Sequence, residues 1–148
     1  MTLVATPQQT AGPLFGFALL YEGCDKAVDP EAADAVIIEG RVTDASGLPL
    51  QWEAELEFWI DEQFARARSM DDGLFSVVLR KPLARAVSDG AVLAPHVNVL
   101  IFGRGLNRRL DTRLYFPDEE AANASDPVLA LVPEARRDTL IARATNDP

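Results

Sequence analysis

The run His96-Val97-Asn98-Val99-Leu100-Ile101-Phe102 is the most strand-like stretch of the 148-residue chain, and it decides the fold class. β-branched and aromatic residues favour the extended backbone of a sheet over a helix. Similar short runs recur along the chain, and turn residues such as Gly, Pro and Asp separate them. We predict strands at residues 36–42, 54–60, 74–79, 96–102, 110–116 and 139–143.

Little of the remaining chain is typical of helix. Residues 118–126 are predicted to form one short helix, with acidic side chains in the first turn, where the helix dipole favours them. Residues 81–94 contain Pro82 and Gly90 and are predicted to form a loop. Many short strands with little helix indicate an all-β fold, here a mainly antiparallel β-sandwich. In the strand 54–60 acidic and apolar residues alternate, so we expect one solvated face and one buried face.

The chain is expected to divide into an arm and one domain. Residues 1–20 contain Pro7 and Pro13, which disfavour a helix, and we predict an extended N-terminal arm there. Residues 21–148 are predicted to form a single β-sandwich domain, because the length fits one domain. Several arm residues are too apolar for a free tail and are expected to bury against this domain or a partner: Phe15, Phe17, Leu19 and Leu20.

The overall charge argues against several classes of partner. The net charge is −9 and the pI is near 4.5, whereas binding to nucleic acid or to an anionic membrane surface needs clustered Lys and Arg. No stretch approaches the roughly 20 apolar residues of a membrane-spanning helix. The single cysteine, Cys24, cannot form an internal disulfide. We therefore expect a cytoplasmic protein with no nucleic-acid or membrane partner.

The only histidine is His96, and Asn98 lies two residues further on the same face of the predicted strand. A His-x-His pair would suit a transition metal, but a neutral amide oxygen is a weak ligand. We therefore interpret His96 as a histidine with a local hydrogen-bond partner, and we predict no metal site in this chain. Motifs of nucleophilic catalysis such as GxSxG and HExxH are absent from the sequence, so no catalytic residue is predicted either.

Four arginines gather within ten residues of this acidic chain: Arg104, Arg108, Arg109 and Arg113. Arg104 stands between Gly103 and Gly105, just after the strongest predicted strand. A guanidinium exposed in this way can hold a carboxylate with two parallel hydrogen bonds. The residues alone leave a second interpretation open, in which Arg104 is a solvated turn residue or forms an ion pair between subunits.

Three stretches, in the same order along the chain, resemble the α subunits of the protocatechuate 3,4-dioxygenases, which belong to the intradiol ring-cleaving dioxygenase family. They are Gln9-Thr10-Ala11-Gly12-Pro13, the segment from Ala94 to Gly105, and Thr112-Arg113-Leu114-Tyr115-Phe116-Pro117-Asp118-Glu119 with the later Arg137-Asp138-Thr139-Leu140-Ile141-Ala142. Each stretch alone is a weak signal, but together they cover most of the chain and are specific.

The resemblance implies an oxidoreductase complex of aromatic catabolism, built from two homologous β-sandwich subunits. In such a pair the β subunit holds a non-haem Fe(III) with two tyrosines and a His-x-His pair, and the α subunit completes the substrate pocket. Here His96 and Asn98 match the two histidine positions, and no tyrosine stands between Trp59 and His96, where the tyrosine ligands belong. The resemblance therefore implies an iron-free α-type subunit, with Fe(III) in the partner.

Two residues match pocket positions of the family, Thr10 in the arm and Arg104 near the carboxylate of a protocatechuate-like catechol. Leu14 stands where α subunits usually have a tyrosine, and the stretch from residue 59 to residue 73 is shorter than in the family. The chain also ends soon after residue 143, where α subunits usually continue with further strands. We expect an iron-bearing β-type subunit to cover the arm and any open sheet edge.

A different class of function remains as the alternative. The turn and strands between Gly40 and Trp59 also fit transthyretin-like sandwiches. The chain would then be a non-catalytic binding or assembly module of that kind.

Overall fold

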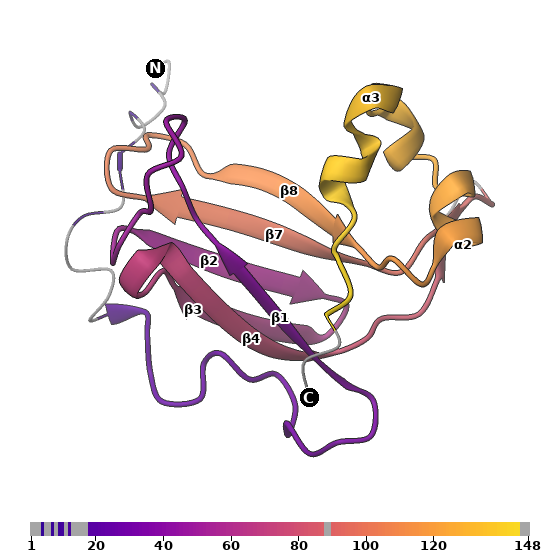
Figure 1. Ribbon diagram of the computed structural model, residues 1–148, viewed down its shortest axis with the longest axis horizontal. Helices are drawn as coiled ribbons and strands as arrows, with labels where there is room; N and C mark the ends of the chain where they lie inside the picture. The colour runs from indigo at the N-terminus through magenta and orange to yellow at the C-terminus, as the bar shows by residue number, and fades with distance from the viewer. Residues whose placement is uncertain are drawn as a thin grey trace.

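Three antiparallel sheets make up the computed structural model, which describes residues 4, 7, 9, 10, 12, 18–87 and 90–145 (Figure 1). The first two are a four-stranded sheet in the order β3-β2-β7-β8 and a two-stranded sheet of β1 and β4, and β5 and β6 form a small hairpin. The strands are β1 (Ala35–Arg41), β2 (Ala54–Ile60), β3 (Gln63–Arg68), β4 (Leu74–Arg80), β5 (Arg85–Ala86), β6 (Val92–Leu93), β7 (His96–Gly103) and β8 (Leu110–Tyr115).

The core lies between the two larger sheets. The large sheet contributes Leu56, Phe58, Val97 and Val99, and the small sheet contributes Ile38, Val77 and Leu79. All of these side chains are buried, so the inner faces of both sheets are apolar, as a sandwich requires. The predicted all-β, mainly antiparallel β-sandwich is confirmed.

Helix occurs only as short pieces among the described residues: a single 3₁₀ turn at Asp71–Gly73 precedes β4, and the other pieces follow β8 (Figure 1). The predicted helix at 118–126 is present as α2 (Glu120–Ser125), followed by α3 (Glu134–Arg137) and single 3₁₀ turns at Leu129–Leu131 and Asp138–Leu140. No helix in the described part of the chain is long and apolar enough to cross a membrane. The division into an arm (1–20) and one domain (21–148) stays a prediction, and Leu14, Phe15 and Phe17 lie outside the described residues.

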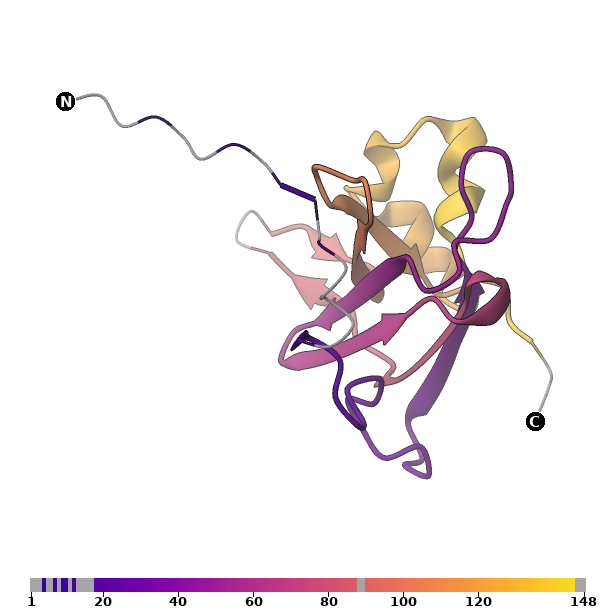
Figure 2. The same ribbon diagram turned by 90° about the vertical axis from the view of Figure 1, so that its left-hand side faces the viewer.

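Three sequence predictions were wrong. The strand expected at 139–143 is a 3₁₀ turn followed by one isolated bridge, between Tyr115 and Ile141. The loop expected at 81–94 contains the β5–β6 hairpin, which stands apart from the larger sheets in Figure 2. The face of β2 that was expected to be solvated is buried, with 1% of Glu55 and 9% of Glu57 exposed, because β3 brings an arginine beside them.

The residues around Cys24 connect the two sheets at one side. The carbonyl of Cys24 accepts a hydrogen bond from the amide of Arg66 on β3 at 2.6 Å. The carbonyl of Asp25 accepts from the amide of Val78 on β4 at 2.8 Å, and the amide of Ala27 donates to the carbonyl of Val78 at 2.9 Å. One short segment therefore pairs with an edge strand of each sheet.

Candidate functional site

The turn after β7 presents Arg104 to solvent. β7 ends at Gly103, and Gly105 has a φ of 86°, a conformation that favours glycine. The amide of Arg104 donates to the carbonyl of Glu53 at 3.0 Å, which ties the turn to the segment before β2. The side chain of Arg104 is 73% exposed, and its Nη1 lies 3.7 Å from Glu53 Oε1. This long, exposed ion pair leaves the guanidinium able to exchange partners.

Thr10 holds this turn from the N-terminal arm. Its hydroxyl donates to the carbonyl of Gly103 at 3.2 Å and accepts from the amide of Gly105 at 2.8 Å. The two hydrogen bonds bracket Arg104 on both sides along the chain. The structure thus brings together Thr10 and Arg104, the two site residues expected from the sequence, although they are far apart in the chain.

A depression of about 480 Å³ lies beside this turn. Arg108 and Arg109 line it, and Arg109 Nε lies 3.0 Å from Asp111 Oδ1. Three of the four clustered arginines therefore share one end of the molecule. Arg113 is on β8, where its register partner is Asn98, and it belongs to a different part of the surface.

His96 is buried and has a local partner. Its Nδ1 lies 2.7 Å from the carbonyl of Ala94, so this nitrogen carries the hydrogen and donates it. Burial lowers the pKa of His96, which keeps the ring neutral near pH 7. The expected hydrogen-bonded histidine is confirmed. In the described residues no group of three or more His, Cys, Asp and Glu side chains is placed to hold a metal ion.

Asp126, which is fully buried behind Tyr115, was not predicted from the sequence. Its carboxylate accepts hydrogen bonds from the Tyr115 hydroxyl at 3.1 Å and from the amides of Ala94, Val128 and Leu129 at 2.8, 2.9 and 2.7 Å. Burial opposes ionisation of Asp126, but the hydrogen bonds outweigh it and lower its pKa. Asp126 therefore ties the helical segment, which we define as residues 120–140, to the residues just before β7.

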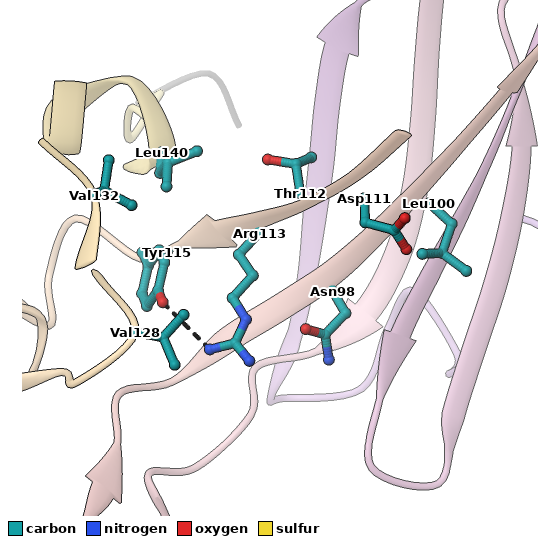
Figure 3. A pocket seen from close by; sticks show the side chains of 9 residues that line it. All are labelled: Asn98, Leu100, Asp111, Thr112, Arg113, Tyr115, Val128, Val132 and Leu140. Carbon is teal, nitrogen blue, oxygen red and sulfur yellow. Dashed lines mark hydrogen bonds between the residues drawn. The ribbon is translucent and has the colours of Figure 1, made fainter. Parts of the chain in front are cut away.

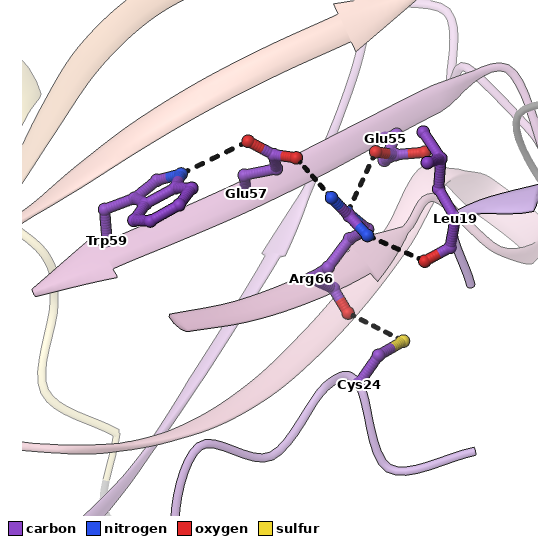
Figure 4. A network of polar contacts seen from close by, with 6 residues as sticks. All are labelled: Leu19, Cys24, Glu55, Glu57, Trp59 and Arg66. Carbon is purple, nitrogen blue, oxygen red and sulfur yellow. Dashed lines mark hydrogen bonds and ion pairs between the residues drawn. The ribbon is translucent and has the colours of Figure 1, made fainter. Parts of the chain in front are cut away.

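A buried charge network occupies the outer face of β2 and β3 (Figure 4). Arg66 Nη2 lies 2.6 Å from Glu57 Oε1, and Arg66 Nε lies 3.1 Å from Glu55 Oε1. Arg66 Nη1 donates to the carbonyl of Leu19 at 2.8 Å, and Trp59 Nε1 donates to Glu57 Oε2 at 3.2 Å. Burial raises the pKa of Glu55, and the charge of Arg66 opposes this effect. The network holds the segment at Leu19 on the sheet and is structural.

The sequence is similar to those of known proteins over almost its whole length. The chain is 34% identical to the protocatechuate 3,4-dioxygenase alpha chain of Pseudomonas putida, over 95% of this chain and 84% of that one. It is 35% identical to the alpha chain from Burkholderia cepacia, over 99% and 87% of the two chains. The beta chain from Burkholderia cepacia is 29% identical, over 77% of this chain and 57% of that one. No family model matches the chain.

Among solved structures, the catechol 1,2-dioxygenase of Acinetobacter radioresistens superimposes with a TM-score of 0.62 at 20% identity. The match covers 81% of this chain and 47% of that one, so the chain spans about half the length of this neighbour. At this identity the likeness concerns the fold, whereas the two alpha chains are similar over nearly the whole sequence. The chain belongs to the family of protocatechuate 3,4-dioxygenase alpha chains, within the intradiol dioxygenases.

Proposed function

We propose that the chain is the α-type subunit of an intradiol dioxygenase and that Arg104 binds the carboxylate of a protocatechuate-like catechol at the boundary with a β-type subunit. The observation that carries the proposal is the turn itself. The Thr10 hydroxyl braces Gly103 and Gly105, and the guanidinium between them stays exposed. In this complex Thr10 positions the turn and Arg104 binds the substrate.

The chemistry of Arg104 suits this role. A guanidinium stays charged at any working pH and matches the two oxygens of a carboxylate. Its present partner, Glu53, is 3.7 Å away and 46% exposed, so the ion pair is worth little. A substrate carboxylate can replace it at small cost. Arg108 and Arg109 nearby add to the local positive charge in an otherwise acidic molecule.

The donor set of this chain does not fit Fe(III), so the iron is assigned to the partner. His96 is the one histidine of the chain, and Asn98, two residues further on, offers only a neutral amide. The two tyrosines of the chain, Tyr21 and Tyr115, lie outside the stretch from Trp59 to His96. Two relatives are named alpha chains and another is named a beta chain, which favours a paired enzyme over the transthyretin-like module.

The test is to co-express the chain with a β-type subunit and to measure kinetics with a carboxylated and a plain catechol. Losing a charge-assisted pair costs about 1.5–3 kcal/mol, so Arg104→Ala should raise KM for the carboxylated substrate by about one to two decades. Plain catechol should be much less affected. Iron content should stay unchanged, because Arg104 is not a ligand.

Three further variants control this test. Arg80→Ala removes another exposed arginine, which lies on β4 and pairs with Asp34 at 2.6 Å. This variant should leave the KM for both substrates unchanged. Thr10→Val removes the brace, and Thr10→Ser should restore it. Equal losses on both substrates would mean that Arg104 holds the interface together, and no loss on either would make it a solvated turn residue. Both outcomes contradict the proposed role.

A further inference from the structure

A second depression, of about 440 Å³, lies on the outer face of the four-stranded sheet where the helical segment meets it (Figure 3). Asn98, Arg113 and Tyr115 line it from β7 and β8, and Val128, Val132 and Leu140 form an apolar wall. Asn98 is five residues before the end of β7, which places this depression roughly 17 Å along the strand from the Arg104 turn.

Arg113 is the one cationic side chain that lines this depression. It is half-buried, and Figure 3 shows its guanidinium directed toward the space between Tyr115 and Asn98. Its Nη1 is 3.5 Å from the Tyr115 hydroxyl, which is a long contact. Among the described residues no carboxylate lies within 4.0 Å of its nitrogens. A half-buried positive charge therefore has donors that no anion of the described chain uses.

The neighbouring groups do not neutralise Arg113. Asp126 already accepts four hydrogen bonds, from Tyr115 and three backbone amides. Asp111, at the rim, is paired with Arg109 at 3.0 Å. The Tyr115 hydroxyl donates its hydrogen to Asp126, so it offers Arg113 only a neutral oxygen. Of the two charged side chains that line the depression, Asp111 and Arg113, only Arg113 has no ion-pair partner among the described residues, and it lies next to the apolar wall.

We propose that this depression binds a small organic acid, with its carboxylate on Arg113 and its apolar body against Val128, Val132 and Leu140. A guanidinium with free donors takes a carboxylate through parallel hydrogen bonds, and the half-buried setting strengthens them. The side-chain amide of Asn98, opposite Arg113 on β7, adds a neutral donor. Binding sites for small ligands combine apolar walls with a few polar groups in this way. The proposal does not depend on the function of Arg104.

The test uses the full chain and two probes, benzoate and its neutral analogue benzamide, titrated by calorimetry and by amide NMR. Benzoate should bind saturably at millimolar or lower concentration and shift the amide signals of Val128, Val132 and Leu140. Benzamide should bind at least about tenfold more weakly, because it cannot form the charged pair. This comparison needs no variant, so it stands even if a substitution impairs folding.

Variants then assign the site. Arg113→Gln should weaken benzoate binding by about ten- to a hundredfold, and Arg113→Lys by less, because a charge remains. Arg80→Gln, at an exposed arginine outside both proposed sites, should leave benzoate binding unchanged. The proposal is overturned if benzoate does not shift the amide signals of Val128, Val132 and Leu140 at millimolar concentration, if benzamide shifts them equally well, or if Arg113→Gln leaves the affinity for benzoate unchanged.

Discussion

Arg66 and Arg113 lie on the same outer face of the four-stranded sheet, on its two edge strands, but their surroundings are opposite. Arg66 contacts two buried carboxylates and a backbone carbonyl. Arg113 contacts one neutral hydroxyl at 3.5 Å and faces an open depression. The comparison shows that residue type and strand position do not decide the role of an arginine. The neighbours that the fold brings to it do.

The difference has an energetic meaning. Burying a charge is costly unless it is paired, and a pair that loses one member leaves the other charge uncompensated. Arg66 compensates Glu55 and Glu57, whose side chains are only 2% and 12% exposed. Arg113 compensates no carboxylate among the described residues, so its removal leaves no buried negative charge without a partner. The following predictions compare the two arginines, starting with the largest expected effect.

Arg66→Met should lower the free energy of unfolding by about 3–5 kcal/mol, because Glu55 and Glu57 remain buried without a counter-charge. Urea denaturation followed by circular dichroism measures this. The matched control is the triple variant Arg66→Met, Glu55→Gln, Glu57→Gln, which removes the uncompensated charges and should recover much of the loss. Exposed surface ion pairs contribute less than about 1 kcal/mol. A loss of that size for the single variant would mean that the network is not structural.

Asp126→Asn tests the carboxylate that stands near Arg113 but is held by other groups. The amide nitrogen of Asn would face backbone amides that also donate, so we expect a loss of about 1–3 kcal/mol in unfolding free energy. Because the folded pKa of Asp126 lies below its ordinary value of 3.8, its contribution is present above that pH and is lost as pH falls through the folded pKa.

The dependence of unfolding free energy on pH in the acidic range should therefore differ between the wild-type chain and Asp126→Asn. The wild-type chain should lose stability on acidification below about pH 4, and the Asn variant should lack this part of the loss. Parallel curves for wild type and variant would contradict the role given to Asp126. Arg113→Met in the Asn variant would reveal a direct pairing between Arg113 and Asp126 if the two losses were not additive.

Arg113→Met should change the free energy of unfolding by less than about 1 kcal/mol, because the guanidinium has no carboxylate to leave behind. Thermal and urea unfolding measure this, with Arg66→Met as the reference for an arginine that is needed. If Arg113→Met costs as much as Arg66→Met, Arg113 is structural, and the organic-acid site loses its main argument.

The sequence predicts the fold well wherever a strand is apolar on its inner face. The strands β1, β2, β4, β7 and β8 were all expected, because β-branched and aromatic residues recur there. β3 was missed because Gln63-Phe64-Ala65-Arg66-Ala67-Arg68 has no β-branched residue. That omission also explains the error on β2. Without β3, the sequence offered no counter-charge for Glu55 and Glu57, so both were expected to face solvent, whereas Arg66 of β3 pairs with them in the structure.

The candidate site shows the same division. The exposed position of Arg104 was predicted from the glycines on its two sides, whereas its role in a pocket, like that of Thr10, comes from the resemblance and stays a prediction. Their contact was not predicted, because the Thr10 hydroxyl meets Gly103 and Gly105 across more than ninety residues of chain. Asp126 had no local signal beyond its place before Pro127. Two of its four donors, Ala94 and Tyr115, are brought to it only by the packing of residues 120–140 against β7 and β8, and the other two lie in the turn that follows it.

The pairing of residues 24–27 with β3 and β4 limits how copies of this chain can associate through their sheets. Unpaired edge strands are the usual template for adding a strand from another molecule, and fibrous growth needs two open edges on one sheet. Here Cys24 occupies the edge of β3 at Arg66, and Asp25 and Ala27 occupy the edge of β4 at Val78. These contacts obstruct strand addition at those points of β3 and β4, and the bridge between Tyr115 and Ile141 covers one end of β8 in the same way.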